Sequence, residues 1–314
     1  PDFDPNNRNT FLEKNMFNRT IAGNYEMGSV FKPITVAIGI DKGIINPEMT
    51  FDVSKPISGI DDFKPHNGKY SVKEIIVNSS NRGTAQIASK IGKSNQKEFF
   101  DKVGFNEQIK FEIKETALPL GNKHNWGNHE TMRIGYGYAF SITPLHLVSC
   151  YATLINDGKK MLPTLIKNKK NKKSERVIKS ETSSYINQLL RAVVLETKVT
   201  GKKVKVKGYE IAGKTGTSNI LNKFGKYEEG KNLTSFVAVF PSSKPKYVVL
   251  TSIENPKKTK DINFRLTGAT VAGPLTKNII LRMIEILGIP VPTSQEILKA
   301  DISRIYKNTQ NVNF

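Results

Sequence analysis

The sequence predicts an α+β fold, with helices in the middle of the chain and antiparallel strands near its end. Three observations support this class. Stretches with helical start and stop signals dominate residues 35–190. After residue 200 come runs rich in Val, Ile, Phe and Tyr, separated by Gly, Lys, Asn and Pro. A last long apolar stretch, residues 271–287, ends at Gly288 and Pro290 as a helix would.

Capping signals place the helices of the first half. Pro33 is tolerated in a first helical turn, and Gly43 ends the apolar stretch that follows it. Ser71 and Glu74 form a capping box, and Thr143 precedes a proline as an N-cap does. The predicted helices cover residues 33–40, 72–78, 83–91, 95–103, 144–156 and 183–195, with a loop at residues 79–82. Residues 1–24, 46–69 and 105–128 are predicted to be irregular, the last two with short strands.

Three stretches carry the composition of long strands: residues 209–217, 233–240 and 247–254. We expect them to form a three-stranded antiparallel core sheet. One domain is predicted over residues 1–290, with a mainly helical part at about 35–190 and a sheet-plus-helix part at about 200–290. In the tail, residues 291–314, Thr293 and Glu296 form a capping box before apolar residues that share one helical side. The tail is therefore either an amphipathic helix or a frayed terminus.

The composition is that of a globular protein, since 38% of the 314 residues are hydrophobic and 9% aromatic. A net charge of +20 invites a nucleic-acid interpretation. Much of the excess lies at residues 167–173 and 202–207, in loop-like sequence without interleaved aromatic residues. We therefore expect no nucleic-acid partner. The sequence also lacks a run of 18 apolar residues that would predict a membrane span.

The cysteine and histidine content argues against a metal site. The single cysteine, Cys150, excludes an intrachain disulfide and a cysteine-based zinc cluster, and it fits a small core residue. His66, His124, His129 and His146 show no metal-ligand spacing, and His124 and His129 fit a polar surface loop. We expect neither a metal nor a cofactor.

A candidate nucleophile opens the first predicted helix. Ser29 and Lys32 are three positions apart and so share a helix face. A neighbouring amine can take the proton that a serine must lose before it attacks a carbonyl. The Ser-x-x-Lys pattern also occurs at Ser94 and Ser243, where a helix cap and a turn explain it. Alone, the pattern is therefore a weak signal.

Two further motifs give Ser29 its weight. Ser79 and Asn81 lie between two predicted helices, where a tight loop can direct both side chains into one cleft. Lys214, Thr215, Gly216 and Thr217 lie on the first long strand. Each motif also has a purely structural explanation: Ser-x-Asn is common in turns, and Lys-Thr-Gly can end an exposed strand. Their occurrence in this order, each in the expected local context, makes coincidence a poor explanation.

This set of motifs resembles the penicillin-binding proteins and class A β-lactamases. The sequence is similar to the transpeptidase domain of class B penicillin-binding proteins over nearly its whole length, and most similar to the septal enzyme of cell division. The supporting stretches are residues 25–33, 79–81, 132–138, 142–145, 214–217 and 268–290. The resemblance implies a penicillin-binding/β-lactamase-like fold, an antiparallel sheet flanked by helices plus a mostly helical subdomain.

The resemblance also implies roles for these residues. Ser29 would attack the penultimate D-Ala carbonyl of a stem peptide, and Lys32 would act as base. Ser79 would relay a proton to the leaving amine, and Asn81 would hold Lys32 and a substrate amide. Lys214, Thr215 and Thr217 would bind the terminal carboxylate, Gly216 would permit close approach of the peptide, and the N–H groups of Ser29 and Thr217 would form the oxyanion hole.

Two alternatives remain open at this point. A D-Ala carboxypeptidase or β-lactamase-like serine hydrolase would end in attack by water, but no matching Glu motif stands out between Asn81 and Lys214. A non-catalytic β-lactam sensor domain would keep Lys32 and Asn81 and hold a permanent adduct. The fate of the acyl-enzyme would separate these readings from a transpeptidase.

The resemblance carries further expectations about partners and location. The partners would be peptidoglycan stem peptides ending in D-Ala-D-Ala, β-lactam antibiotics, a membrane glycosyltransferase and other division proteins. The domain would lie on the periplasmic face of the bacterial cytoplasmic membrane, anchored by a segment upstream of Pro1. We also expect two strands of the family's five-stranded sheet to lie upstream, because they precede the stretch that residues 4–6 match.

Overall fold

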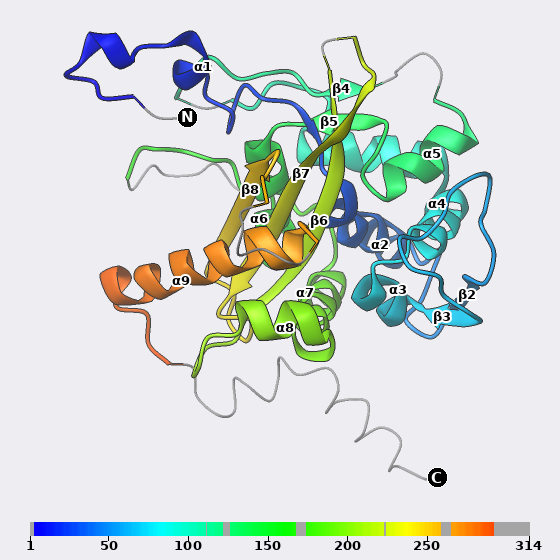
Figure 1. Ribbon diagram of the computed structural model, residues 1–314. Coiled ribbons are helices and arrows are strands. Elements are labelled where there is room, and N and C mark those ends of the chain that lie inside the picture. Colours follow the sequence, from blue (N-terminus) through cyan, green and yellow to red (C-terminus); the bar gives the residue numbers. More distant parts are fainter. Residues whose placement is uncertain are drawn as a thin grey trace.

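Figure 1 shows the computed structural model, which describes residues 3–110, 112–121, 126–167, 174–222, 224–258 and 265–291. Its central element is an antiparallel sheet in the order β6-β7-β8. The strands span Ala212–Leu221 (β6), Tyr227–Phe240 (β7) and Tyr247–Glu254 (β8). The α+β class and the three-stranded core sheet are confirmed for the described residues.

The first hairpin of this sheet is longer than predicted. β6 begins at Ala212 rather than at residue 209 and continues past Thr217, while β7 begins at Tyr227 rather than at residue 233. The extension pairs polar residues such as Asn219 with Asn232, up to Leu221 with Tyr227. Backbone pairing does not require apolar side chains, so composition alone did not show these strand ends.

Helices cover both faces of the sheet (Figure 1). The helices are α1 (Glu13–Met16), α2 (Lys32–Asp41), α3 (Val72–Asn78), α4 (Asn81–Val103), α5 (Asn128–Gly135), α6 (Pro144–Ile155), α7 (Ser180–Glu196), α8 (Lys198–Val204) and α9 (Gly273–Leu287). Shorter turns are η1 (Arg8–Thr10), η2 (Gly28–Phe31) and η3 (Gly268–Ala272). The short strands β1 (Tyr25–Glu26), β5 (Phe140–Ile142) and β4 (Leu120–Gly121) form one small sheet, and β2 (Thr50–Asp52) pairs with β3 (Lys69–Ser71).

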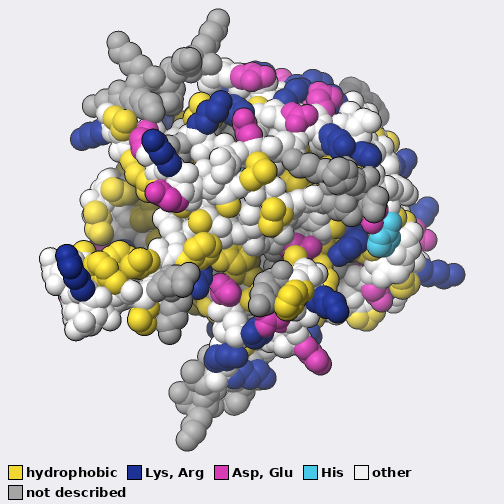
Figure 2. Space-filling model, turned by 90° about the horizontal axis from the view of Figure 1, so that it is seen from above, with side chains coloured by type: hydrophobic (Ala, Val, Ile, Leu, Met, Phe, Trp, Pro, Cys, Tyr) yellow, Lys and Arg dark blue, Asp and Glu magenta, His cyan; other side chains and the backbone are white. Residues whose placement is uncertain are grey.

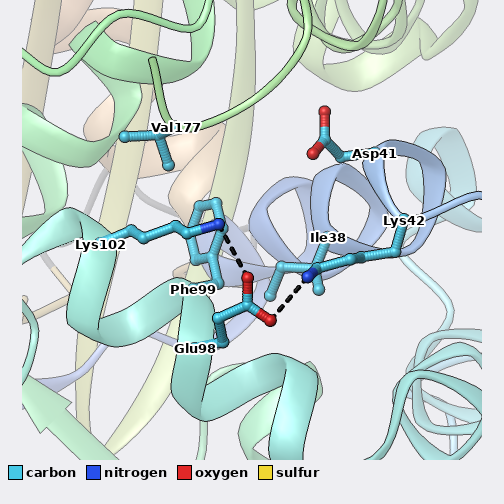
Figure 3. A pocket seen from close by; sticks show the side chains of 7 residues that line it. All are labelled: Ile38, Asp41, Lys42, Glu98, Phe99, Lys102 and Val177. Atoms are coloured by element: carbon cyan, nitrogen blue, oxygen red, sulfur yellow. Dashed lines mark hydrogen bonds and ion pairs between the residues drawn. The ribbon is translucent and has the colours of Figure 1, made fainter. Parts of the chain in front are cut away.

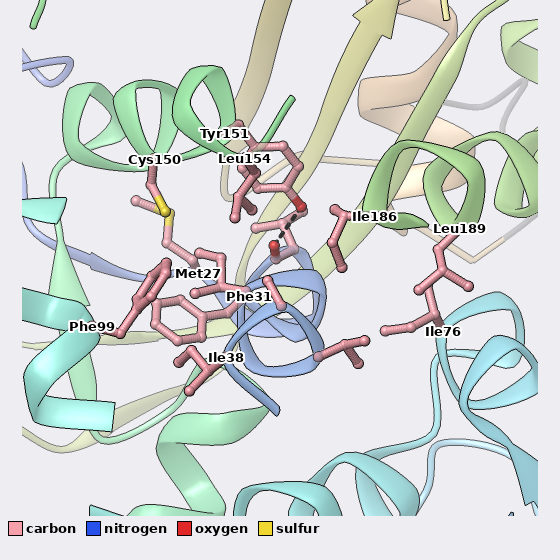
Figure 4. Close-up of a cluster of buried hydrophobic side chains, with 14 of the residues drawn as sticks. Met27, Phe31, Ile38, Ile76, Phe99, Cys150, Tyr151, Leu154, Ile186 and Leu189 are labelled. Atoms are coloured by element: carbon pink, nitrogen blue, oxygen red, sulfur yellow. Dashed lines mark hydrogen bonds between the residues drawn. The ribbon is translucent and has the colours of Figure 1, made fainter. Parts of the chain in front are cut away.

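The central strand β7 divides the core into two layers. Val237 and Val239 belong to the larger cluster, which contains side chains of α2, α4, α6 and α7 (Figure 4). Phe236 and Ala238 belong to the smaller cluster, which contains residues of α8 and α9. This alternation follows from the two-residue period of a strand. It holds β6, which carries Lys214, between packed layers.

Two helix predictions agree with the backbone, and others need correction. The predicted helices 83–91 and 95–103 are the two parts of α4, which meet at a kink where Gly92 has non-helical backbone. Ser80 is the N-cap of α4, so Asn81 lies in the first helical turn and not in the loop. The helices α1, α5 and α8 were not predicted, and Lys202 and Lys203 lie in the last turn of α8 rather than in a loop.

The remaining sequence expectations have mixed outcomes. Cys150 is buried as predicted, and burial raises the pKa of its thiol. His129 is exposed as predicted but lies on α5 rather than in a loop, whereas His124 and the tail from residue 292 lie outside the described residues. In the part of the chain that the structure describes, no helix is long and apolar enough to span a bilayer.

The described residues on the face seen in Figure 2 form no large patch of charges of one sign. Basic and acidic side chains are interspersed there, with hydrophobic side chains near the middle. A small hollow of about 10 Å³ lies elsewhere, between α2 and α4. Glu98 bridges Lys42 and Lys102 beside it (Figure 3). At this size it has room for little more than a water molecule.

Candidate active site

A cleft of about 860 Å³ contains six of the eight predicted site residues. It is lined by Ser29, Ser79, Asn81, Thr215, Gly216 and Thr217, which come from η2, the α3–α4 junction and β6. The other two, Lys32 and Lys214, are buried beside it. The fold thus brings together side chains that are up to about 190 residues apart in the sequence.

The turn that carries Ser29 is anchored from the core. Phe31 is buried against Phe100 and Phe105. The hydroxyl of Tyr151, fully buried on α6, donates a 2.6 Å hydrogen bond to the carbonyl oxygen of Val30 (Figure 4). The two residues that follow Ser29 are therefore anchored in the core and hold it at the open end of α2.

Gly216 allows this turn to lie directly against β6. A Cβ at Gly216 would come within 3.0 Å of Cγ1 of Val30 and 3.1 Å of the carbonyl oxygen of Met27. The sequence resemblance implied that the missing side chain permits close approach of the peptide substrate. The close neighbour in this structure is the turn of Ser29 itself, so Gly216 sets the distance between Ser29 and Thr217.

Ser79 links the two lysines. Its Oγ accepts a hydrogen bond from Nζ of Lys32 at 3.2 Å and another from Nζ of Lys214 at 2.9 Å. Lys32 also donates to the carbonyl oxygen of Ser79. Ser79 has left-handed backbone, with φ of 59° at the C-cap of α3. For the described residues, no hydrogen bond joins Lys32 to Ser29, a contact that in free enzymes often tightens only when substrate binds.

Burial governs the charge of both lysines. It holds the pKa of Lys32 well below its ordinary value of 10.5, assisted by the cation of Lys214 and opposed by the carboxylate of Asp62. Burial also lowers the pKa of Lys214 to about 7. A neutral Lys32 can accept a proton near neutral pH, which an ordinary lysine cannot.

Asn81 is held by a loop that the motif analysis did not include. Its Nδ2 donates to the carbonyl oxygen of Asp61 at 2.9 Å. The acceptors of Lys32 among the described residues are both on Ser79, rather than the amide oxygen of Asn81. The carboxylate of Asp62 accepts hydrogen bonds from the N–H groups of Asn81 and Arg82 and from Oγ of Ser80. Asp62 thus fixes the first turn of α4.

The strand motif is also tied to its surroundings. Nζ of Lys214 donates to the carbonyl oxygen of Thr215 at 3.1 Å. The hydroxyl oxygen of Thr217 accepts from the N–H of Gly268 at 3.1 Å, which leaves the hydroxyl proton to donate elsewhere. A cation and two threonine hydroxyl groups beside one cleft suit a carboxylate ligand.

Several residues of the cleft were missed by sequence reasoning. Tyr138 and Gly268 line it, and the guanidinium of Arg265 lies 3.8 Å from the ring centroid of Phe63 at its edge. Tyr138 and Gly268 lie in stretches that supported the family resemblance, but no site role was predicted for them, and Arg265 and Phe63 carry no catalytic pattern. The described residues contain no cluster of three or more His, Cys, Asp or Glu side chains that could hold a metal ion.

Comparisons with known proteins agree with this geometry. A family model described as the penicillin binding protein transpeptidase domain matches residues 1–281. The chain belongs to this family. The resemblance predicted from the motifs is therefore confirmed, and the matched residues include all the described ones that line the cleft.

Relatives of this family carry related names. The chain is 31% identical to the probable peptidoglycan D,D-transpeptidase FtsI of Caulobacter vibrioides, covering 92% of this chain and 51% of that protein. It is 29% identical to the stage V sporulation protein D of Bacillus subtilis, covering 95% and 48%. The chain thus spans about half the length of these relatives.

Solved structures share the fold. The TP domain of penicillin-binding protein 3 from Burkholderia pseudomallei has a TM-score of 0.78 and 26% identity, covering 88% of this chain and 83% of that one. Penicillin-binding protein 3 of Mycobacterium tuberculosis, complexed with aztreonam, has a TM-score of 0.81 at 24% identity, covering 93% and 69%. The predicted penicillin-binding transpeptidase fold is confirmed.

Proposed function

We propose that this chain is a peptidoglycan D,D-transpeptidase that cross-links stem peptides through an acyl-enzyme on Ser29 and is acylated there by β-lactams. The observation that carries the proposal is the shared oxygen of Ser79, which lies within hydrogen-bond distance of two buried lysines beside the cleft. That arrangement supplies a base, a proton relay and a cation around one candidate nucleophile.

The first step forms the acyl-enzyme. Oγ of Ser29 attacks the carbonyl carbon of the penultimate D-Ala, and its proton passes to neutral Lys32. The N–H groups of Ser29 and Thr217 stabilise the oxyanion, a contribution typically worth about 3–4 kcal/mol for each donor. The contact of Gly216 with the turn of Ser29 supports this pairing, because it brings the two backbone segments together.

The second half of this step expels the terminal D-Ala. The hydroxyl of Ser79 gives its proton to the departing nitrogen and is reprotonated from Lys32. Lys214, Thr215 and Thr217 bind the carboxylate of the leaving D-Ala, and Asn81 donates to a substrate amide. An amine of a neighbouring stem peptide then attacks the ester, returning its proton by the same route and freeing Ser29.

The finer assignment concerns the setting of the reaction. We propose a role in septal wall synthesis on the periplasmic face of the cytoplasmic membrane, beside a membrane glycosyltransferase and other division proteins. The support is similarity: relatives matched over most of this chain are named FtsI. A complementation test in cells depleted of their own septal enzyme examines this role; rescue of elongation alone would contradict it.

Intact mass spectrometry after incubation with benzylpenicillin tests the central proposal. The wild-type chain should gain one penicilloyl mass that maps to the peptide containing Ser29. Ser29→Ala should gain none while keeping its circular dichroism spectrum and melting temperature. An adduct that persists on the variant, or a wild-type chain that stays unmodified, would overturn the assignment.

The fate of a peptide acyl group separates transfer from hydrolysis. A stem pentapeptide ending in D-Ala-D-Ala should exchange its terminal residue for labelled D-Ala faster than it is hydrolysed. Hydrolysis would need a group that holds a water molecule near the acyl-enzyme. Among the described residues that line the cleft, Glu196 is the one with a carboxylate, and it forms a 3.1 Å ion pair with Lys73. Hydrolysis that dominates in the wild type and is lost in Glu196→Gln would identify a carboxypeptidase instead.

A further inference from the structure

Glu26, three residues before Ser29, is a buried carboxylate outside the motifs, with 5% of its surface exposed. It accepts a 2.6 Å hydrogen bond from the backbone N–H of Ala139 and a 2.9 Å hydrogen bond from Oη of Tyr227. A buried carboxylate is unfavourable unless it is hydrogen-bonded. These two bonds allow Glu26 to be buried, and both lead to elements around the cleft.

The first bond reaches a strained segment. Ala139 has φ of 60°, a left-handed conformation that disfavours a residue with a side chain by about 1–2 kcal/mol. Two residues earlier, the carbonyl oxygen of Gly137 accepts from the N–H of Gly28 at 3.0 Å. A Cβ on Gly137 would lie 2.1 Å from the carbonyl oxygen of Gly28, so the contact is close.

Tyr138 lies between these two anchors and lines the same cleft as Ser29. Both anchors come from the segment that leads into the nucleophile turn, one from a backbone N–H of Gly28 and one from the side chain of Glu26. The main-chain bond of Gly28 and the carboxylate of Glu26 therefore help to place Tyr138 relative to Ser29. They do so together with the bond from the N–H of Tyr138 to the carbonyl oxygen of Arg133 and the pairing of β1 with β5.

The second bond of Glu26 holds the β6–β7 hairpin. Tyr227 lies on β7 near the hairpin tip, and its hydroxyl also accepts from Nη2 of Arg133 at 3.0 Å. The ring of Tyr227 packs edge-on against that of Tyr138, with 6.2 Å between centroids. At the backbone of Glu26, Oγ of Ser218 on β6 donates to the carbonyl oxygen at 2.6 Å. One residue thus joins the nucleophile segment, the Tyr138 loop and the hairpin.

We propose that Glu26 is a positioning residue for the reaction of Ser29: its carboxylate keeps Ala139 left-handed and so fixes Tyr138 as a wall of the cleft. The inference rests on the proposed function, because the rate it concerns is acylation of Ser29. A displacement of about 1 Å in a site can reduce its rate by roughly 100-fold. Loss of the carboxylate should therefore lower the acylation rate of the folded protein, and not only its free energy of unfolding.

The test compares second-order rate constants for acylation by a fluorescent penicillin. Glu26→Ala should be slowed by roughly 10- to 100-fold. Glu26→Gln keeps an acceptor oxygen for the N–H of Ala139 and should stay within a few-fold of the wild type. If the wild type is not acylated, the proposed function fails; if it is acylated and Glu26→Ala reacts equally fast, this inference alone fails.

Glu210 offers the matched control. It is also a buried glutamate, with 2% of its surface exposed, and its carboxylate accepts from one backbone N–H, that of Ser243 at 3.1 Å. It lies just before β6, two residues from the end opposite the hairpin tip. Glu210→Ala should lower the melting temperature while acylation of the folded protein keeps its wild-type rate. Equal slowing of both alanine variants would show a merely structural effect and overturn the proposal.

A double variant tests the route through Ala139. Glycine adopts a φ of 60° without the penalty of a side chain. Ala139→Gly in the Glu26→Ala background should therefore recover at least several-fold of the lost acylation rate. Absence of any recovery would overturn the step in which Glu26 acts by holding Ala139.

Discussion

Lys32 and Lys214 direct their ammonium groups to a single oxygen, Oγ of Ser79, at 3.2 and 2.9 Å. Both side chains are fully buried, so neither can be surrounded by water. Two cations this close in a buried place repel strongly, and loss of one proton relieves the repulsion. Below a pH of about 7 the geometry therefore pairs a neutral Lys32 with a cationic Lys214, and the charges around the pair decide the pH at which the base is free.

The pH dependence of acylation should shift in opposite directions in two variants. The Asp62 carboxylate raises the pKa of Lys32, so Asp62→Asn should move the ascending limb of the profile to lower pH. The Lys214 cation lowers the pKa of Lys32, so Lys214→Met should move that limb to higher pH, on a smaller residual rate. The measurement is the acylation rate constant across the pH range in which each protein stays folded.

The aspartate variant is the cleaner of the two. Asparagine keeps an acceptor oxygen for the N–H groups of Asn81 and Arg82, so the first turn of α4 retains a cap. A shift of both variants in the same direction would contradict Lys32 as the titrating base. So would an unmoved profile.

Two adjacent serines should separate chemistry from stability. Ser79→Ala removes the oxygen shared by the lysines, so acylation should fall by about 10²–10⁴-fold, the range of a lost acid–base group. Ser80→Ala removes an N-cap that accepts from the N–H of Gly83 at 3.0 Å, so unfolding should become about 1 kcal/mol easier. Penicillin kinetics and denaturant unfolding of both variants provide the check. Slow acylation in Ser80→Ala with only a loss of stability in Ser79→Ala would contradict these roles.

Local patterns predicted the fold class and placed Ser29 at a helix, Ser79 after one and Lys214 on a strand. The order of the three motifs and their resemblance to a known family selected these residues for the site, since Ser-x-x-Lys alone occurs three times. The same reasoning missed Asp62, which reaches Asn81 through space from an irregular loop. It also missed Glu26, whose partner Ala139 is 113 residues away. Contacts of this kind leave no periodicity in the chain.

The errors at the ends of elements have a similar cause. Helix α8 (Lys198–Val204) has only seven residues and a glycine within it, too short to show a helical period. The β6–β7 hairpin continues into polar sequence, where backbone pairing rather than side-chain burial maintains the strands. By contrast, the interruption at Gly92 was predicted correctly, because α4 consists of two helical parts that meet there at a kink with non-helical backbone.

Gly216→Ala should slow acylation by disturbing the nucleophile turn. The new Cβ would lie 3.0 Å from Cγ1 of Val30, tighter than ordinary contact, so β6 and the turn must separate by a few tenths of an ångström. We expect a loss of roughly 10-fold in acylation rate, because the oxyanion donors no longer match. Adding Val30→Ala should restore part of the rate, and an unchanged single variant would remove this role from Gly216.

Lys214 should make the stability of the protein rise with pH. Its pKa is about 7 in the folded state against an ordinary 10.5, so between these values the unfolded chain binds more protons than the folded one. The free energy of unfolding then increases with pH through that window, and the penalty for burying Lys214 is complete below pH 7.

Lys214→Met should be the more stable protein near neutral pH. At about 1.4 kcal/mol for each pKa unit, the gain has a ceiling of about 5 kcal/mol, reduced by the lost hydrogen bonds to Ser79 and Thr215. Its advantage should shrink as the pH approaches 10.5. Denaturant unfolding of both proteins across the window measures the difference, and a gap that does not change with pH would show that Lys214 does not lose its proton on folding.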